Sequence, residues 1–173
     1  TWRDVGAGVS MALAAIVGAG EASGAAFQLL EQNASGLGNA YAGQAAAAED
    51  ASTVWFNPAG MARLPGRQAV GAVNFIRPSA KFSDGGSTPP TGLPGPRGGE
   101  GGEAGGWNVV PNAYLSWELK PGVLWAGVGI NAPFGLKTEW DGTWVGRFHA
   151  VKSEVRSVNV NPALAWRIGD RLT

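Results

Sequence analysis

The sequence has no cysteine, a single histidine and few charged residues. Without cysteine the chain has no disulfide scaffold, no thiol nucleophile and no cysteine-ligated zinc, and one histidine is too few for a histidine-based metal centre. Charged residues make up 15% of the chain, against roughly 25% in an ordinary soluble domain, and the formal net charge is zero. That balance excludes the basic footprint of a nucleic-acid-binding protein. We therefore predict no metal, no cofactor and no nucleic-acid partner.

Glycine and apolar residues are what the chain has in abundance. It holds 28 glycines in 173 residues, and 45% of its residues are hydrophobic, which is too apolar for a disordered glycine-rich linker. The sequence starts at Thr1 without a methionine and stops at Thr173 directly after a turn-like stretch. We expect an apolar architecture, of which this chain is a fragment.

The first segment has the pattern of a secretory signal peptide. Arg3 precedes an uncharged run over residues 5–20, and the small residues Ala22, Ser23 and Gly24 follow it. The run is shorter than the roughly 20 residues that a membrane-spanning helix needs. We predict a signal peptide over residues 1–24 and therefore export; a buried or membrane-anchoring helix is the alternative.

Residues 25–65 have a helical pattern rich in small residues. Leu37 and Tyr41 are spaced four apart, and a turn is expected at Asn57-Pro58 because a residue that precedes proline avoids the helical region. No strand precedes Gly36 and Gly38, and Tyr41 occupies the third-glycine position of a dinucleotide fingerprint, so we exclude that fingerprint. The segment is predicted to form a compact plug of short helices.

Beyond Pro65 the hydrophobic period changes from helical to two, which is the period of a β-strand. The alternation covers residues 107–117, 124–132 and 158–166, and more weakly 69–76. Each run has about the ten residues of a tilted transmembrane strand, with tryptophan near strand ends, as in an interfacial girdle. We predict that residues 66–173 hold about the first four strands of an antiparallel transmembrane β-barrel, too few to close one, since single-chain barrels start at about eight strands.

The connections between these runs distinguish a barrel from an ordinary β-sandwich. Long segments over residues 78–106 and 134–150 alternate with short ones over 118–122 and 168–171. Outer-membrane barrels pair long extracellular loops with short periplasmic turns, whereas sandwiches follow no such rule. Pro111, Pro133 and Pro162 argue against regular central strands, because each lacks a ladder donor. The alternation favours the barrel.

Several motifs follow one another along the sequence: Ala25-Ala26-Phe27-Gln28-Leu29, the run from Ser35 to Gly43, Glu49-Asp50-Ala51, Asn57-Pro58-Ala59, Val110-Pro111-Asn112 and the run from Gly135 to Trp140. In this order they resemble FadL/TodX-type proteins, the outer-membrane transporters of long-chain fatty acids and hydrocarbons, from the start of the mature chain. The resemblance covers residues 25–173. It implies a fourteen-stranded barrel closed at its periplasmic end by an N-terminal hatch, which places the hatch at residues 25–65.

The resemblance also implies a path for the ligand. A hydrophobic compound enters from outside, contacts the hatch N-terminus at Phe27, and leaves sideways at a kink in the third strand. The kink matches the lateral-gate residues Asn131, Ala132, Pro133, Phe134 and Gly135 and is contacted by the hatch motif Asn57, Pro58 and Ala59, with Pro133 departing from the family pattern. A proline that cannot donate and a permissive glycine predict a break in strand pairing there.

The function implied is uptake of fatty acids or other hydrophobic compounds across the bacterial outer membrane. The expected partners are an apolar ligand, outer-membrane lipid and lipopolysaccharide, with a monomeric protein. A non-transporting barrel that serves as adhesin, receptor or structural porin is the alternative, and a secreted soluble β-protein is a third. We predict no catalytic residue: His149 has Ser153 nearby, but nothing marks a third orienting group or an oxyanion hole.

Overall fold

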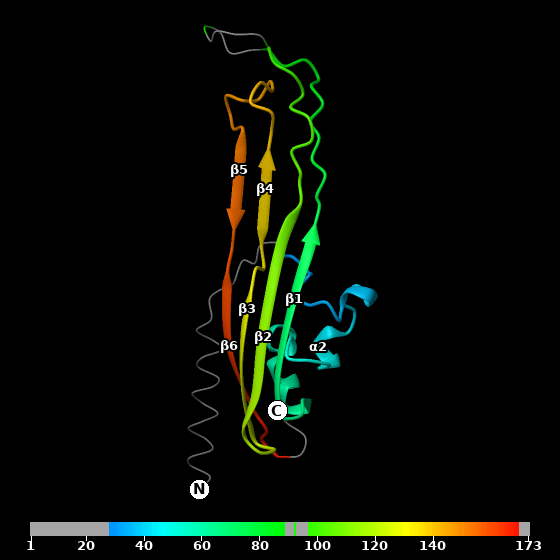
Figure 1. Cartoon of the computed structure of the whole chain (residues 1–173), viewed down its shortest axis with the longest axis vertical. Coiled ribbons are helices and arrows are strands. Elements are labelled where there is room, and N and C mark those ends of the chain that lie inside the picture. Colours follow the sequence, from blue (N-terminus) through cyan, green and yellow to red (C-terminus); the bar gives the residue numbers. More distant parts are fainter. Residues whose placement is uncertain (1–27, 89–91, 93–96, 170–173) are drawn as a thin grey trace, which may run out of the picture.

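The computed structural model describes residues 28–88, 92 and 97–169. The predicted signal peptide, residues 1–24, and the predicted ligand contact Phe27 lie outside the described residues. Figure 1 shows a tall, curved layer of strands with a small helical body beside its lower half. Among the described residues, no helix is long and apolar enough to cross a membrane.

Six strands form two antiparallel sheets. The larger sheet has the order β1 (Arg67–Ile76), β2 (Asn108–Lys120), β3 (Leu124–Asn131) and β6 (Asn159–Trp166). The smaller pairs β4 (Gly135–Glu139) with β5 (Lys152–Arg156). The smaller sheet continues the larger one, because β4 follows β3 along the chain and β5 leads into β6. Above β3 and β6, β4 and β5 extend the same layer upward (Figure 1). We call this layer the wall, and it contains the four strands predicted from the sequence.

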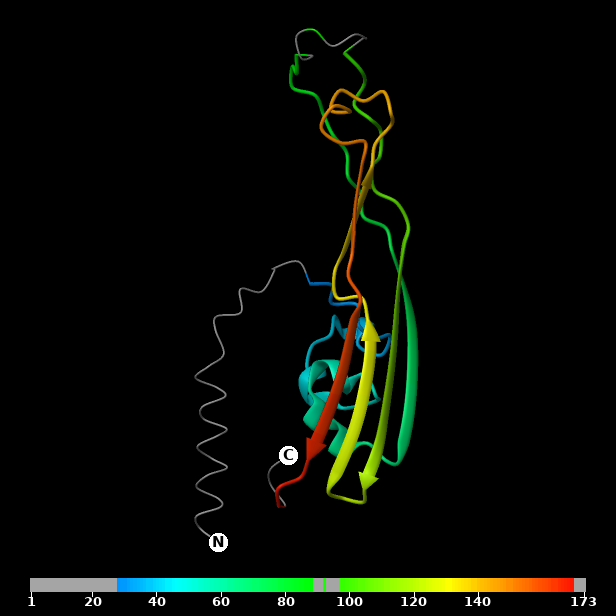
Figure 2. The ribbon, with the colours of Figure 1, turned by 90° about the vertical axis from the view of Figure 1, so that its left-hand side faces the viewer.

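The strand bounds confirm the first three predicted connections, with one correction. The short turn predicted over residues 168–171 lies partly outside the described residues. The segment 134–150, expected to be a long loop, begins with β4, and the chain returns along β5. A five-residue strand such as β4 has too few positions for a period of two to stand out from a loop. The true connection between these strands covers residues 140–151, and Figure 2 shows it reaching the end of the wall opposite the helices.

All three prolines were expected to disturb their strands, but two of them, Pro111 and Pro162, lie within regular ladders. Pro111 lies opposite Val73 in the ladder between β1 and β2, and Pro162 lies opposite Val128 in the ladder between β3 and β6. The N–H of Arg167 donates to the carbonyl of Val123 (2.8 Å). Because hydrogen-bonded and non-bonded pairs alternate, Pro162 occupies a non-bonded position whose N–H would point away from β3. The ladder therefore loses no bond to β3 at this proline.

The hatch forms four short helical turns before β1 begins. They are η1 (Leu37–Asn39), α2 (Gln44–Ala47), α3 (Thr53–Phe56) and η2 (Pro58–Arg63). Asn57 is extended, as expected before proline, and its side chain caps η2 by accepting the N–H of Ala59 (3.2 Å). Pro58 occupies the first position, where a helix has no use for an N–H.

The hatch packs against one face of the wall, and the core lies between them (Figure 2). Val54 and Met61 of the hatch, both fully buried, share this core with Tyr114, Trp125 and Ala165 of the wall. Burying each of the two hatch side chains contributes about 1.5–3 kcal/mol. This interface holds the hatch to the lower half of the wall.

The opposite face of the wall is apolar and exposed. Alternate residues of the ladder register share this face, among them Leu115, Val128 and Pro162, which lie in one row. The large exposed apolar side chains of the four-stranded sheet include Val73, Phe75, Val109, Leu115, Ile130, Val160 and Leu164. Trp107 and Trp166 are also exposed, near opposite ends of the strands, whereas Trp125 is buried against the hatch. The sequence pattern therefore assigned the faces correctly.

Candidate functional site

The third and fourth strands of the wall are both interrupted at the same level. The ladder between β3 and β6 ends at the pair Asn131 and Asn159, and pairing resumes at Gly135 and Arg156. Residues 132–134 therefore face only residues 157–158, so the β3 side carries one extra residue, as in a β-bulge. We call these two segments the break; it lies where the sequence predicted one.

Ser157 bridges the break on the β6 side. Its hydroxyl donates to the carbonyl of Phe134 (2.6 Å) and accepts the N–H of Phe134 (2.9 Å). The N–H of Ser157 donates to the same carbonyl (3.0 Å). A single side chain thus keeps β4 and β5 aligned with the strands below, although the register has changed.

On the β2 side the interruption is longer and has no such bridge. Pairing between β2 and β3 ends at Ala113 and Ile130, and higher up the N–H of Glu139 donates to the carbonyl of Ala104 (3.0 Å). Between these contacts lie residues 105–112 on one side and 131–138 on the other. No strand pairing joins these two described segments. We call this part of the wall the window.

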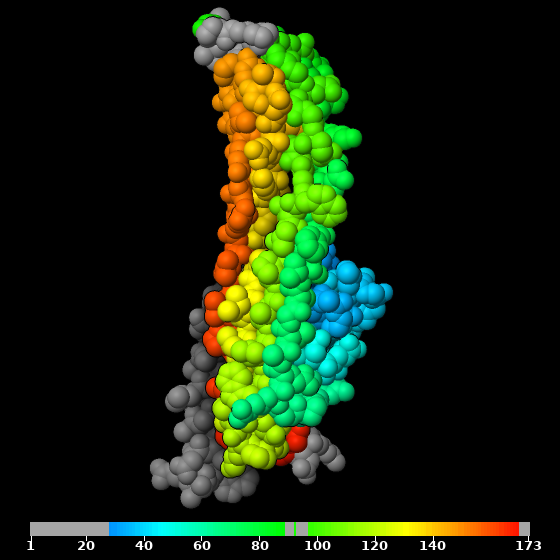
Figure 3. Space-filling model, viewed as in Figure 1, coloured from blue at the N-terminus to red at the C-terminus, as the bar shows by residue number. Residues whose placement is uncertain are grey.

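The window is narrow but open in the structure. Its upper margin holds a cavity of about 80 Å³ lined by residues of both sides, among them Gly106, Trp107, Asn108, Lys137 and Glu139. Lys137 and Glu139 form an ion pair there (2.9 Å). The space-filling view shows the chain segments separating at this height (Figure 3).

The first described residues of the hatch reach the break from inside. The N–H of Leu29 donates to the carbonyl of Pro133 (2.8 Å), a residue without its own N–H. The carbonyl of Glu31 accepts from the side-chain amides of Asn74 (2.7 Å) and Asn112 (2.9 Å). The hatch N-terminal segment is therefore tied to three chain segments of the wall.

The hatch motif lies elsewhere in the hatch. The Asn57 amide donates to the carbonyl of Ala45 (2.8 Å), and its side-chain oxygen accepts from Ala59. These side-chain bonds organise the hatch itself, whereas Leu29 supplies the hydrogen bond to Pro133. The predicted gate residues, Asn131 to Gly135, all lie at the break or directly beside it. The predicted hatch motif, Asn57, Pro58 and Ala59, lies at the start of η2.

Sequence reasoning missed the polar side chains that face the hatch from the wall. They are Asn74, Asn112 and Tyr114, which are buried, and Asn159, which is half-buried beside the predicted gate residue Asn131. The sequence did carry one signal. Within β2, β3 and β6 most residues of one parity are asparagine, tyrosine or small residues, and this alternation indicates a polar inner face. Nothing in the sequence indicated their partners, which are mostly hatch carbonyls.

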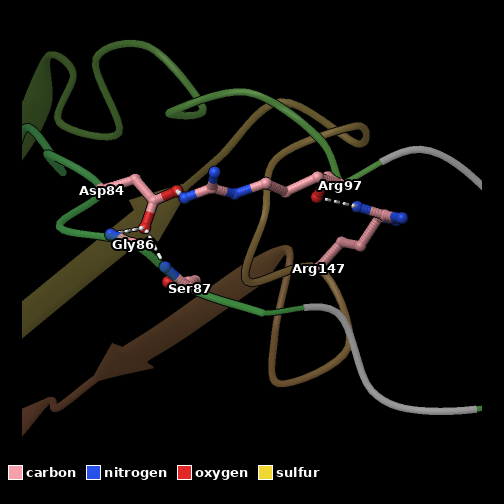
Figure 4. A network of polar contacts seen from close by, with 5 residues as sticks. All are labelled: Asp84, Gly86, Ser87, Arg97 and Arg147. Atoms are coloured by element: carbon pink, nitrogen blue, oxygen red, sulfur yellow. Dashed lines mark hydrogen bonds and ion pairs between the residues drawn. The ribbon is translucent and has the colours of Figure 1, made fainter.

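Two loop segments meet far from the hatch, at the opposite end of the wall. Asp84 accepts the N–H groups of Ser87 (2.8 Å) and Gly86 (3.1 Å) and pairs with Arg97, while Arg147 donates to the Arg97 carbonyl (3.2 Å; Figure 4). The Ser87 N–H is the main cause that holds the pKa of the Asp84 carboxyl well below its usual range. Stacked rings of Trp140 and Trp144 lie nearby in the sequence. The bond from Arg147 to the Arg97 carbonyl clasps the described part of the loop between β1 and β2 to the segment 140–151.

Among the described residues no group of three or more His, Cys, Asp or Glu side chains is placed to hold a metal. His149 is exposed, and its backbone N–H donates to the carbonyl of Gly146 (2.9 Å). Ser153 lies in β5 opposite Thr138.

A family model described as outer membrane protein transport protein (OMPP1/FadL/TodX) matches residues 15–173. The chain belongs to this family. The resemblance read from the motifs is thereby confirmed, and so are the bacterial outer membrane as its location and the antiparallel transmembrane barrel as its fold.

Relatives and a solved structure agree with this assignment. Outer membrane protein P1 of Haemophilus influenzae is 34% identical over 94% of this chain and 37% of that protein. The long-chain fatty acid transport protein of Escherichia coli K12 is 29% identical over 93% of this chain and 34% of that protein. The crystal structure of a Pseudomonas aeruginosa FadL homologue matches 84% of this chain and 35% of that chain, with a TM-score of 0.72 and 27% identity. The chain thus spans about a third of the length of these relatives.

Proposed function

We propose that the protein containing this chain takes up long-chain fatty acids or other hydrophobic compounds and releases them sideways through the window. The observation that carries the proposal is the coincidence of three features at one height. The wall loses its pairing between β2 and β3–β4, the third strand is interrupted at residues 132–134, and the hatch N-terminal segment bonds Pro133 from inside.

A side exit suits an apolar ligand on energetic grounds. Each methylene removed from water gains roughly 0.8 kcal/mol, so a water-filled pore is a poor route for a long hydrocarbon chain. A route from an apolar interior through the wall into lipid keeps the chain out of water. The exposed Val109 and Trp107 beside the window make its outer margin apolar.

The partners follow from the same arrangement. The ligand is an apolar small molecule, and we place Phe27 and the hatch segment after it at the inner end of its path. The exposed apolar face of the wall contacts outer-membrane lipid, and the clasped loops face lipopolysaccharide. We propose a monomer, because a closed barrel has no free strand edge through which copies could pair. We also propose that it has no catalytic activity.

Obstructing the window tests the lateral route. A Cβ on Gly135 would meet only the carbonyl oxygen of Val155, at 3.9 Å, so a larger side chain can be accommodated at the margin of the window. In the full-length protein we expect Gly135→Trp to lower uptake of a radiolabelled long-chain fatty acid about tenfold, a barrier increase of roughly 1.4 kcal/mol.

Gly142→Trp is the matched control, because Gly142 is exposed in the connection 140–151 and a Cβ there meets nothing within 4 Å. Uptake in the control should equal that of the native protein. Unchanged uptake in folded Gly135→Trp protein would refute the lateral route.

The ligand class is tested by what the protein carries. The full-length protein is purified from outer membranes in detergent, and co-purifying small molecules are extracted and identified by mass spectrometry beside a control barrel. Enriched fatty acids or hydrocarbons support the transporter. A clean protein that also fails to bind added fatty acid and hydrocarbon favours the adhesin, receptor or structural barrel.

A further inference from the structure

A chain of side-chain hydrogen bonds runs from the hatch to the break. The buried Tyr114 hydroxyl donates to the Gln32 carbonyl (2.8 Å) and accepts from the side-chain amide of Asn131 (3.1 Å). The Asn131 side-chain oxygen accepts in turn from the Asn159 amide (3.1 Å). Asn131 and Asn159 are the last pair of the ladder below the break, so the hydrogen-bond chain ends where the wall changes register.

The wall holds the hatch N-terminal segment by its main chain. Asn74 and Asn112 donate to the Glu31 carbonyl, Tyr114 donates to the Gln32 carbonyl, and Pro133 accepts from the Leu29 N–H. We call these contacts the upper seat. Because they involve only hatch peptide groups, the upper seat depends on the position of the segment and not on its side chains.

The upper seat is incompletely satisfied. The side-chain oxygens of Gln32 and Asn112 are buried there without a hydrogen-bond donor. Buried acceptors without donors are unfavourable, so part of what the seat gains in bonds is offset by these two atoms. The segment can therefore leave at lower cost than its bond count indicates.

Tyr114 has one hydroxyl proton and two candidate acceptors, which makes it a two-state element. While the segment is seated, the proton goes to the Gln32 carbonyl, and the oxygen accepts from Asn131. When the segment leaves, the group that remains beside the hydroxyl is the Asn131 side-chain amide, which now faces it with its nitrogen. To accept a hydrogen bond from the Tyr114 hydroxyl, the Asn131 side-chain amide must turn over. Its oxygen then no longer accepts the hydrogen bond from the Asn159 amide.

We propose that Tyr114 is the positioning residue through which the seating of residues 29–33 sets the wall at the break. With the hatch seated, Asn131 holds Asn159 and the lower margin of the break is closed. With the hatch unseated, the Tyr114 hydroxyl donates its hydrogen bond to the side-chain oxygen of the turned-over Asn131 amide. The hydrogen bond that Asn159 now donates to that oxygen is then lost. The coupling between the hatch segment and the break does not depend on the proposed function. Only its use in releasing a ligand rests on that function.

The test unseats the hatch without touching the hydrogen-bond chain. In the full-length protein in detergent, Asn74→Ala combined with Asn112→Ala removes both donors to the Glu31 carbonyl. We expect amide hydrogen exchange to rise at least about tenfold in residues 29–33, since about tenfold is the factor for one buried hydrogen bond and two are removed. Exchange should also rise at Asn131, Ala132 and Phe134 and in residues 157–159. Faster exchange in 29–33 alone would overturn the proposal.

A second set of variants asks whether the effect passes through Tyr114. Tyr114→Phe keeps the ring and removes the hydroxyl, so the double asparagine variant should no longer alter exchange at the break when it is added to this background. In a Tyr41→Phe background the effect should persist, because the Tyr41 hydroxyl bonds the Asn33 carbonyl (3.0 Å) within the hatch. An equal increase at the break in both backgrounds would overturn the role of Tyr114.

Exchange and uptake separate this inference from the proposed function. Coupled exchange together with unchanged uptake in Gly135→Trp protein would leave Tyr114 as the coupling residue of a barrel that does not transport by this route. Blocked uptake together with uncoupled exchange would keep the lateral route and reject Tyr114.

Discussion

The hatch meets the lower and the upper half of the wall through different kinds of contact. Below, Val54 and Met61 are fully buried in an apolar core, and Gly127 of β3 allows the two bodies to approach closely. Above, hydrogen bonds to hatch peptide groups replace apolar packing, and the wall itself changes register. Tight apolar packing resists small displacements, whereas a row of hydrogen bonds can be exchanged one by one. The lower contact is thus built as an anchor and the upper one as a releasable seat.

Two neighbouring residues of β3 test the two faces of the lower half, and the outward one gives the largest effect. Val128 shares a row of the exposed apolar face with Leu115 and Pro162. Because a cation near the middle of the bilayer costs about 2–4 kcal/mol, we expect Val128→Arg to lower the free energy of unfolding by that amount. Urea unfolding of the full-length protein in lipid vesicles measures it.

Val151→Arg is the control for this substitution, because Val151 is exposed in the connection between β4 and β5. Its stability should match that of the native protein. A stable Val128→Arg variant would mean that this face of the wall does not contact lipid.

The inward neighbour tests the anchor. A Cβ on Gly127 would lie 2.5 Å from a methyl of Val54 and 2.6 Å from the sulfur of Met61. We expect Gly127→Val to cost about 1–3 kcal/mol by overpacking and to displace the hatch, since the wall backbone cannot yield as far. Limited proteolysis should then cut residues 51–64 faster, while the barrel keeps its heat-dependent electrophoretic mobility.

Gly71→Val provides the comparison in β1, where a Cβ would meet only the Asn112 carbonyl oxygen at 3.8 Å. Hatch protection should be unchanged in this variant. Equal proteolysis of both variants would show that the close approach at Gly127 does not anchor the hatch.

The smallest effect is expected at the bridge across the break. Ser157→Ala removes two side-chain bonds to Phe134 and leaves the main-chain bond of 3.0 Å. We expect a loss of about 0.5–1.5 kcal/mol, confined to the upper half of the wall. Amide exchange at Phe134 should rise about fivefold, with the lower strands unaffected.

Ser153→Ala is the control, because the Ser153 side chain is exposed on β5. Faster exchange spread evenly over the whole wall in Ser157→Ala would contradict a local bridge and with it the contrast between the two halves.

Much of the wall could be predicted because alternation is a local property. The parity of residues 107–117 and 124–132 assigned Leu115 and Val128 to one face, and the register places them opposite each other. The position of the break was predicted from the family resemblance, with which Pro133 and Gly135 agree. Strands β4 and β5 were missed because each has only five residues.

The contacts of the site could not be read in the same way. Tyr114 and Gln32 are 82 residues apart, and Asn112 and Glu31 are 81 apart. The acceptors are peptide carbonyls, which every residue has, so no side-chain pattern marks them. The assignment of the contact at the break to Asn57-Pro58-Ala59 followed the motif, whereas the hydrogen bond to Pro133 comes from Leu29.

Composition and a period of two predicted a membrane barrel wall with a plug, and the family resemblance together with Pro133 and Gly135 predicted the interrupted third strand. These properties depend on each segment's own residues, on which side chains face lipid and which residues lack an N–H. The loss of pairing between β2 and β3–β4 and the polar seat of the hatch arose only when distant segments came together. Strand pairing and main-chain hydrogen bonds depend on where peptide groups meet in space, and that is settled by packing of the whole chain.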